Sequence, residues 1–304
     1  MTIRLRSPAK INLGLEILGK RQDGFHEIRT ILQAISLFDE LEAAPSDRQR
    51  LAINEPRLDH SENLAARAAQ LWTDEIDPEH RALALTLTKR IPAAAGLGGA
   101  SSNAASVLLI ADALFSVEPD PALLHGVAAR LGSDVPFFLD GPAAVASGRG
   151  EALRPIPSLT DSWLVLATPD VSIPRKTLTM YRSLTSDDFT SGDIVADGAA
   201  RLEQRIPLEA DHLVNAFERP LLRRYPELEL LPRNMRSYGA NRVGLSGAGP
   251  TWYAIMNGEP EAVALANELR MQLPSVRVSV ARPLDQRPET VPVDDRNATA
   301  SPDV

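Results

Sequence analysis

The stretch that decides the fold runs from Lys89 to Ala105 and reads KRIPAAAGLGGASSNAA. Before it, residues 82–88 carry leucine at every second position, which is typical of a half-buried strand. After it, apolar residues recur at helical spacing. We expect that helix to begin near Ser101 or Ser102, because serine is a common N-cap residue. The sequence therefore predicts a strand, a glycine-rich loop and a helix in succession.

A loop of this kind suits an anionic ligand. Small residues let backbone amides approach a phosphate, and the helix N-terminus adds a partial positive charge. Two well-known phosphate motifs do not fit: a Walker loop needs a lysine where Ala100-Ser101-Ser102 stands, and the dinucleotide fingerprint needs a glycine at Ser101. The alternative is a plain strand-to-helix turn, although the run is longer than such a turn requires.

The composition limits the class of protein. The 304 residues are enough for one large domain or two of ordinary size. A net charge of −8 argues against a nucleic-acid-binding surface, and no apolar run approaches the length of a membrane span. The chain has no cysteine, which excludes disulfides and thiol catalysis. We expect a cytoplasmic protein, monomeric or homodimeric, that acts on a small molecule and binds neither nucleic acid nor membrane.

Lysine is rare in this chain. There are 28 arginines but only four lysines, namely Lys10, Lys20, Lys89 and Lys176. The bias itself is compositional. It nevertheless draws attention to Lys10, because an ammonium group is a compact point charge that a guanidinium does not replace.

The N-terminal region has the pattern of strands. Residues 2–6 and 11–18 are predicted as two strands separated by residues 7–10. Lys10 and Asn12 are two residues apart, so their side chains project from the same face.

An Asp-Gly turn at residues 20–24 then leads into an apolar, strand-like run from Phe25 to Phe38. His26 lies at the start of this run. By itself it is best interpreted as a surface-loop histidine.

Two helices and an acidic turn follow. Residues 61–72 predict a helix that begins with Ser61-Glu62-Asn63, for which a capped surface helix is the simplest interpretation. Asp120-Pro121 opens another helix that ends at Gly132. Asp134 stands in the segment LGSDVPFF, where an aspartate most often organises the turn.

The second half of the chain has a different order of elements. Setting aside a helical insertion after the first strand, the predicted order is β-α-β-β-α-β, the ferredoxin-like arrangement. The strands are expected at 163–167, 242–245, 252–256 and 276–280, and the helices at 212–224 and 260–272. We therefore expect domains at 1–158 and 159–284, and a disordered tail at 285–304 because this segment is polar, acidic and rich in proline.

The run from Pro92 to Ser102 resembles the phosphate loop of the GHMP kinases, and residues 131–138 resemble their catalytic segment. The resemblance implies an α+β fold of two domains, one like domain 2 of ribosomal protein S5 and one ferredoxin-like. It implies ATP as co-substrate with Mg²⁺, Asp134 as general base, Lys10 as its partner, Asn63 beside the ATP base, and no metal ligand among the side chains. The implied phosphate-binding residues are Pro92, Ala93, Ala94, Ala95, Gly96, Leu97, Gly98, Gly99, Ala100, Ser101 and Ser102.

The segments SPAKINL (7–13) and DGFHE (23–27) resemble one branch of this family, which phosphorylates 4-diphosphocytidyl-2-C-methyl-D-erythritol. That resemblance implies Asn12, Phe25, His26, Thr177 and Tyr181 as substrate-binding residues, with the rings of Phe25 and Tyr181 on either side of the cytosine. A kinase of another alcohol, such as homoserine or mevalonate, or a catalytically silent ligand sensor, remains the alternative. The departures from the family pattern are Ala94, Ala95 and Ala100 in place of glycines, Lys176 before Thr177 in place of a Ser-Thr pair, and Asn215-Ala216 in place of Asn-Asp.

Overall fold

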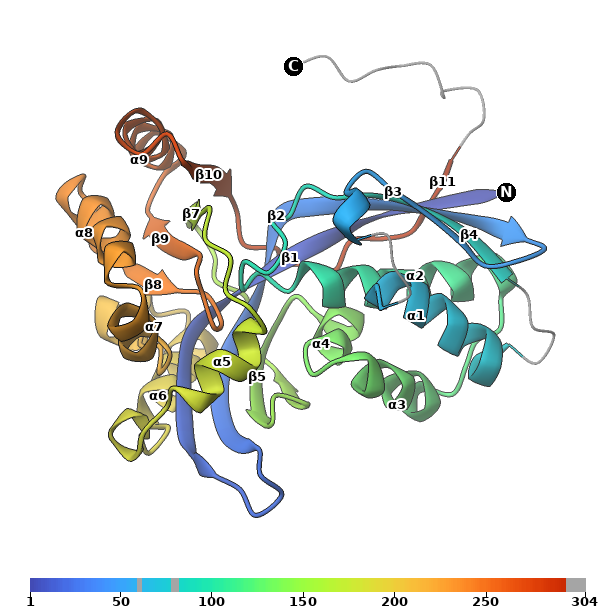
Figure 1. Ribbon diagram of the computed structural model, residues 1–304, viewed down its shortest axis with the longest axis horizontal. Helices are drawn as coiled ribbons and strands as arrows, with labels where there is room; N and C mark the ends of the chain where they lie inside the picture. Colours follow the sequence, from blue (N-terminus) through green and yellow to red (C-terminus); the bar gives the residue numbers. More distant parts are fainter. Residues whose placement is uncertain (59–61, 78–81, 294–304) are drawn as a thin grey trace.

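A long hairpin runs through the whole molecule (Figure 1). It consists of β1 (Thr2–Lys20) and β2 (His26–Ser46) in a computed structural model that describes residues 1–58, 62–77 and 82–293. The two strands predicted before and after residues 7–10 are in fact one. A register shift after Pro8 absorbs the proline, which has no N–H for the ladder, so the strand continues without a break.

The first sheet contains this hairpin and has the order β11-β1-β2-β4-β3, with β5 paired to β2 and β6 paired to β5. One face of the sheet is covered by helices (Figure 1). Leu83, Leu85 and Leu87 are buried beneath them, as their alternation predicts. The remaining strands are β3 (Arg50–Ile53), β4 (Ala82–Thr88), β5 (Ala143–Gly148), β6 (Ala152–Pro155) and β11 (Val291–Val293), and the helices are α1 (Leu64–Leu71), α2 (Gly99–Phe115), α3 (Pro121–Leu131) and α4 (Val135–Asp140).

The second sheet has the order β10-β7-β9-β8, with every pair antiparallel. Numbered along the chain, this is strand order 4-1-3-2, so the predicted ferredoxin-like arrangement is confirmed. The strands are β7 (Trp163–Pro169), β8 (Val243–Leu245), β9 (Trp252–Met256) and β10 (Val276–Ala281). The helices are α5 (Lys176–Arg182) and α6 (Asp193–Glu203) in the insertion, then α7 (Glu218–Arg224), α8 (Leu230–Ser237) and α9 (Glu259–Gln272).

The helix predicted at 212–224 begins only at Glu218. The residues before it pair with β1 instead: Leu15 donates its amide to the carbonyl of Val214 and accepts a bond from Ala216. A contact with a distant strand has replaced the first turns of the helix. Helix α8 was not predicted.

The prediction of a disordered tail is wrong for residues 285–293. Strand β11 pairs with the edge strand β1, and Arg287 donates a hydrogen bond to the carbonyl of Leu139. A polar and proline-rich composition did not prevent this pairing, because an edge strand offers free backbone groups to any extended segment. Residues 294–304 of the predicted tail lie outside the described residues, as does Ser61 at the predicted start of α1.

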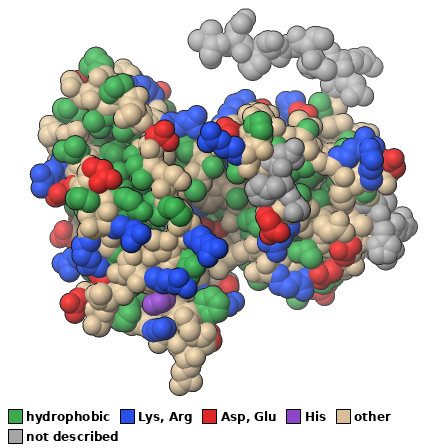
Figure 2. Space-filling view, in the orientation of Figure 1, with side chains coloured by type: hydrophobic (Ala, Val, Ile, Leu, Met, Phe, Trp, Pro, Cys, Tyr) green, Lys and Arg blue, Asp and Glu red, His purple; other side chains and the backbone are tan. Residues whose placement is uncertain are grey.

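One apolar cluster joins the two sheets. Ile11 and Leu13 of β1 pack with Leu164 and Leu166 of β7, and Tyr253 donates its hydroxyl to the carbonyl of Asn12. Figure 2 shows two lobes with a hollow between them on the face in view. In the described part of the chain, no helix is both long and apolar enough to cross a membrane.

Candidate active site

Lys10 is a buried lysine on β1. Its side chain projects from β1, is 4% exposed and donates a hydrogen bond of 2.7 Å to Asn12 Oδ1. Asn12 in turn donates to Thr30 on β2. The prediction that the two side chains share a face is confirmed, and this chain of bonds fixes the position of the ammonium group.

Asp134 faces this ammonium group. Its Oδ2 lies 3.6 Å from Lys10 Nζ, and its side chain is 35% exposed. Asp134 precedes α4, but its side chain makes no capping hydrogen bond to that helix. Asp120, by contrast, caps α3 with a bond from the amide of Ala122. The carboxylate of Asp134 is therefore available for a role other than organising its turn.

The glycine-rich loop ends in helix α2, which begins at Gly99 with Gly98 as its N-cap. The prediction that Ser101 or Ser102 is the cap is wrong, because both serines lie in the first turn of the helix. Gly98 replaces them because the chain enters the helix through a left-handed residue, with φ of 70°, which glycine adopts without strain. The first intrahelical bond runs from Ser102 N to Gly98 O, so the amides before it are available to a phosphate.

A buried acidic residue holds both ends of the loop. Asp39 accepts hydrogen bonds from the amides of Arg90 and Ile91, where the loop starts, and from the side chain of Asn103 in α2. Lys89 completes the network with an ion pair to Asp39. No local sequence pattern points to this support, because Asp39 is far from the loop along the chain.

A second glycine-rich turn, residues 244–250, packs against the loop. Ser246 donates its hydroxyl to the carbonyl of Gly96, at 3.0 Å. A Cβ atom at Gly96 would lie 2.3 Å from Ser246 O and 2.8 Å from Gly249 O, so only glycine fits there. Asn215 holds the turn by donating to Leu245 O and Gly247 O. The departure at Ala216 leaves this contact of Asn215 intact.

Ala94 adopts a φ of 53°, a conformation that L-residues other than glycine rarely take. This alanine is one of the three that replace the family's glycines. The loop therefore carries a backbone cost of about 1–2 kcal/mol at this position. Ala95 is buried, and Ala100 is exposed within the first turn of α2.

The aromatic residues predicted to bind the substrate are partly brought together. The rings of His26 and Tyr181 stack with centroids 5.1 Å apart and an interplanar angle of 29°, and Phe217 meets Tyr181 edge-on. Phe25, in the turn directly before His26, makes no such stack: it is 53% exposed, and the guanidinium of Arg149 covers its ring. The stack that the structure shows on Tyr181 is thus made by His26, and the sandwich of Phe25 and Tyr181 stays a prediction.

The surroundings of two of these rings favour their neutral forms. Burial, with a contribution from Lys20, lowers the pKa of His26, which favours the neutral imidazole. Burial and the charge of Asp134 raise the pKa of Tyr181 to about 12. A neutral imidazole and a neutral phenol are suited to stacking and hydrogen bonding with a base.

Helix α5 brings Thr177 and Lys176 to the same region. Thr177 is exposed in the first turn of α5, and Lys176 donates a hydrogen bond to the carbonyl of Gly249. Three of the four lysines, Lys10, Lys89 and Lys176, thus surround the loop. The rarity of lysine, which draws attention to Lys10 in the sequence, is thus a signal for Lys89 and Lys176 as well.

Asn63 is the N-cap of α1. Its Oδ1 accepts a bond from the amide of Ala65, and its Nδ2 donates to Leu58 O. The simplest interpretation, a capped helix, therefore describes this side chain, and its place beside the ATP base stays a prediction.

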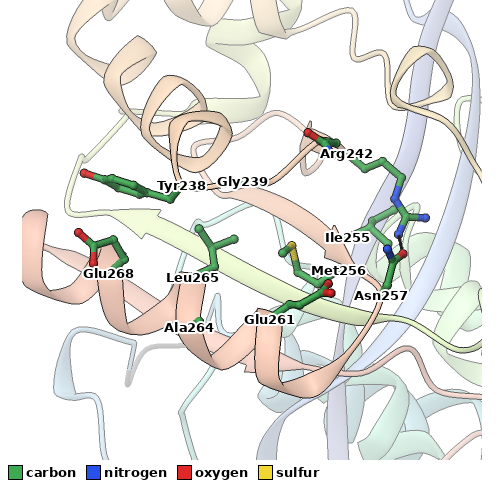
Figure 3. A pocket seen from close by; sticks show the side chains of 11 residues that line it. Tyr238, Gly239, Arg242, Ile255, Met256, Asn257, Glu261, Ala264, Leu265 and Glu268 are labelled. Atoms are coloured by element: carbon green, nitrogen blue, oxygen red, sulfur yellow. Dashed lines mark hydrogen bonds between the residues drawn. The ribbon is translucent and has the colours of Figure 1, made fainter.

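A hollow of about 680 Å³ lies apart from this constellation (Figure 3). It is formed by residues of β9 and α9 and of the segment before β8, including Tyr238, Arg242, Met256 and Leu265. Arg242 donates to the side chain of Asn257 at its margin. None of the lining residues belongs to the phosphate loop or to the pair of Lys10 and Asp134, so this hollow is not the centre of the chemistry.

The comparisons with known proteins agree with this geometry. The family described as GHMP kinases N terminal domain matches residues 63–142. A 4-diphosphocytidyl-2-C-methyl-D-erythritol kinase from Dehalococcoides mccartyi is 36% identical over 268 residues, which cover 88% of this chain and 94% of the relative. One from Acaryochloris marina is 36% identical over 291 residues, covering 89% and 92%.

The solved structures point the same way. A crystal structure of 4-(cytidine 5'-diphospho)-2C-methyl-D-erythritol kinase aligns with a TM-score of 0.77 at 35% identity, over 91% of this chain and 98% of that chain. Homoserine kinase from Cytophaga hutchinsonii, at 16% identity and a TM-score of 0.69 over 95% and 97% of the two chains, shares the fold. The chain therefore belongs to the 4-diphosphocytidyl-2-C-methyl-D-erythritol kinase family of the GHMP kinases.

Proposed function

We propose that this protein transfers the γ-phosphoryl group of ATP to the 2-hydroxyl of 4-diphosphocytidyl-2-C-methyl-D-erythritol, a step of the non-mevalonate (methylerythritol phosphate) isoprenoid pathway. The observation that carries the proposal is the carboxylate of Asp134, which caps no helix and faces Lys10 beside the glycine-rich loop. The identity of about a third of the residues with kinases of this name supports the choice of substrate.

The reaction needs a base, because an alcohol is a poor nucleophile at neutral pH. Asp134 accepts the proton of the hydroxyl group while the hydroxyl oxygen bonds to the γ-phosphorus. The bond from that phosphorus to the bridging oxygen breaks, and ADP leaves. Lys10 orients the carboxylate of Asp134 and offsets the negative charge that gathers during transfer.

ATP is placed by the loop at residues 92–102 and the N-terminus of α2, with Asn63 beside its base. The described residues contain no group of three or more His, Cys, Asp or Glu side chains that would hold a metal. Ser102 Oγ is buried and has no hydrogen-bond partner among these residues, so it fits as a contact for Mg²⁺ that arrives with ATP. Held by the phosphates and Ser102, Mg²⁺ would neutralise phosphate charge.

The other substrate is held through its cytosine. Tyr181 and Phe25 supply aromatic faces, and neutral His26 supplies a polar edge, which is how a base is read outside a duplex. Asn12 and Thr177 are assigned to the remaining polar groups of the substrate. The stack of His26 on Tyr181 supports this assignment over a kinase for homoserine or mevalonate, neither of which carries a base. The pair of Lys10 and Asp134 argues against a silent sensor.

An ADP-release assay over a panel of alcohols tests the proposal. The panel contains 4-diphosphocytidyl-2-C-methyl-D-erythritol, homoserine, mevalonate and water alone. We expect turnover with the first compound only, and loss of that turnover in Asp134→Asn. Turnover of homoserine or mevalonate with a higher kcat/KM would replace the proposed substrate, and no turnover of any alcohol by the folded protein would favour the sensor.

We further propose two domains that divide near residues 155–161, between β6 and β7, where the first sheet gives way to the second. A net charge of −8 supports a partner list without nucleic acid. We place the enzyme in the cytoplasm as a monomer or homodimer.

A further inference from the structure

Lys176 is a lysine at the site that the mechanism above does not use. It is the first residue of α5, and its Nζ donates to the carbonyl oxygen of Gly249. That carbonyl faces the phosphate loop, since a Cβ atom at Gly96 would lie 2.8 Å from it. In Figure 1, α5 lies between the second sheet and helix α4. The ammonium group of Lys176 is therefore placed where α5, the turn at residues 244–250 and the phosphate loop meet.

The catalytic pair is close to this lysine. The charges of both Lys10 and Asp134 act on Lys176. The turn that binds Lys176 also reaches Lys10, because a Cβ atom at Gly247 would lie 3.4 Å from Lys10 Nζ. Two lysines, Lys10 and Lys176, thus lie around the same turn, and Asp134 forms an ion pair with Lys10. When both are protonated, the three groups carry one net positive charge, which an anionic ligand would compensate.

We propose that Lys176 is a second cationic catalytic residue, whose ammonium group contacts the phosphoryl group in transfer from the α5 side while Lys10 holds Asp134. The inference rests on the kinase function proposed above and assigns a role to a residue that departs from the family's usual Ser-Thr pair. Phosphoryl transfer is accelerated mainly by placing positive charge where the negative charge of the transition state gathers. A lysine on α5 supplies such a charge from the second half of the chain.

The charge state of Lys176 makes the proposal measurable. Burial and the positive charge of Lys10 lower the pKa of Lys176 to about 7, while Asp134 opposes the shift. The free enzyme at about pH 8 therefore holds mostly the neutral amine. A bound polyphosphate favours the charged form, raises the pKa and draws in a proton. The other titratable groups here are Lys10 on β1, Asp134 before α4, Tyr181 on α5, and His26 on β2, which stacks on Tyr181.

The test is calorimetry of a non-hydrolysable ATP analogue with Mg²⁺, run at about pH 8 in two buffers of different ionisation enthalpy. The difference between the buffers gives the protons taken up on binding. We expect wild type to take up close to one proton more than Lys176→Arg, which keeps a permanent charge, and than Lys176→Met, which has none. Arg182→Met removes an exposed charge from the other end of α5 and should match wild type.

Steady-state kinetics gives the second measurement. Lys176→Met should lower kcat by roughly 10²–10³, the scale for loss of one group that stabilises transition-state charge, and Lys176→Arg should recover part of it. Equal proton uptake in wild type and Lys176→Arg would overturn the proposal, as would a normal kcat in Lys176→Met. Nucleotide binding needs no acceptor alcohol. Failure of the wild-type enzyme to phosphorylate the methylerythritol compound would therefore overturn the proposed function without changing the proton count.

Discussion

The carboxylate of Asp134 lies 3.6 Å from the ammonium group of Lys10 and caps no backbone amide of the helix that follows it. This geometry distinguishes a catalytic aspartate from one that only organises its turn. The carboxylate oxygens of a turn-forming aspartate would accept hydrogen bonds from backbone amides of the turn. The geometry leaves this carboxylate in an ion pair with Lys10 and with an open side toward solvent.

The first prediction follows from that geometry. Asp134→Asn should lower kcat by about 10²–10⁴, the usual contribution of a general base, with the melting temperature near wild type. Asp120→Ala is the matched control, since it removes a real cap and should cost about 1 kcal/mol of stability without changing kcat. Thermal melts and initial rates measure both. If Asp134→Asn melted early and kept its kcat, Asp134 would be a turn residue.

The second prediction concerns the contact between the loop and the turn at 244–250. Gly96→Ala forces a side chain against Ser246 O at a φ of 86°. It should lower the free energy of unfolding by at least about 2 kcal/mol and weaken ATP binding, because the loop must separate from the turn. Gly126→Ala, in open space within α3, should instead stabilise by roughly 0.5–1 kcal/mol. Equal ATP affinity in Gly96→Ala and wild type would remove the loop from the nucleotide site.

The third prediction concerns the aromatic residues. Phe25→Ala and Tyr181→Ala should each weaken binding of a cytidine diphosphate ligand by about 1–3 kcal/mol, the scale of stacking on a base. Only Tyr181→Ala should also lower the melting temperature, because Tyr181 packs on Phe217 whereas Phe25 is exposed. Calorimetry and thermal melts separate the two effects. Unaltered affinity in both variants would favour a GHMP kinase for an alcohol without a base.

The fourth prediction is that Lys176 destabilises the ligand-free protein. Its pKa is about 7 when folded and about 10.4 when unfolded. Between these values the unfolded chain binds the extra proton, so stability rises with pH by up to about 1.4 kcal/mol per unit and is lost as pH falls toward 7. Lys176→Met should remove this slope and raise the free energy of unfolding at neutral pH. Urea unfolding from about pH 7 to 9.5 measures how the free energy of unfolding depends on pH. Equal pH dependence in wild type and Lys176→Met would contradict the burial of this charge.

Much of the local structure was predictable from the sequence. The alternation of Leu83, Leu85 and Leu87 gave a buried strand, and Asp120 and Gly132 bounded α3 as predicted. The spacing of Lys10 and Asn12 placed both on one face, and the order of elements in the second half predicted its sheet. Each of these follows from the period or the backbone preference of neighbouring residues, which act at short range.

Contacts between distant segments decided the rest. Gly98 and not a serine is the N-cap of α2, where packing against Lys10 and Phe138 leaves no room for a side chain. Pairing with β1 delayed α7 and ordered residues 291–293. Asp39 contacts the phosphate-loop region because the fold brings β2 next to the start of α2. Lys176 lies near Lys10 because the fold brings α5 against the turn at 244–250. Propensity and spacing describe one segment at a time, whereas these positions depend on which segments the folded core makes neighbours.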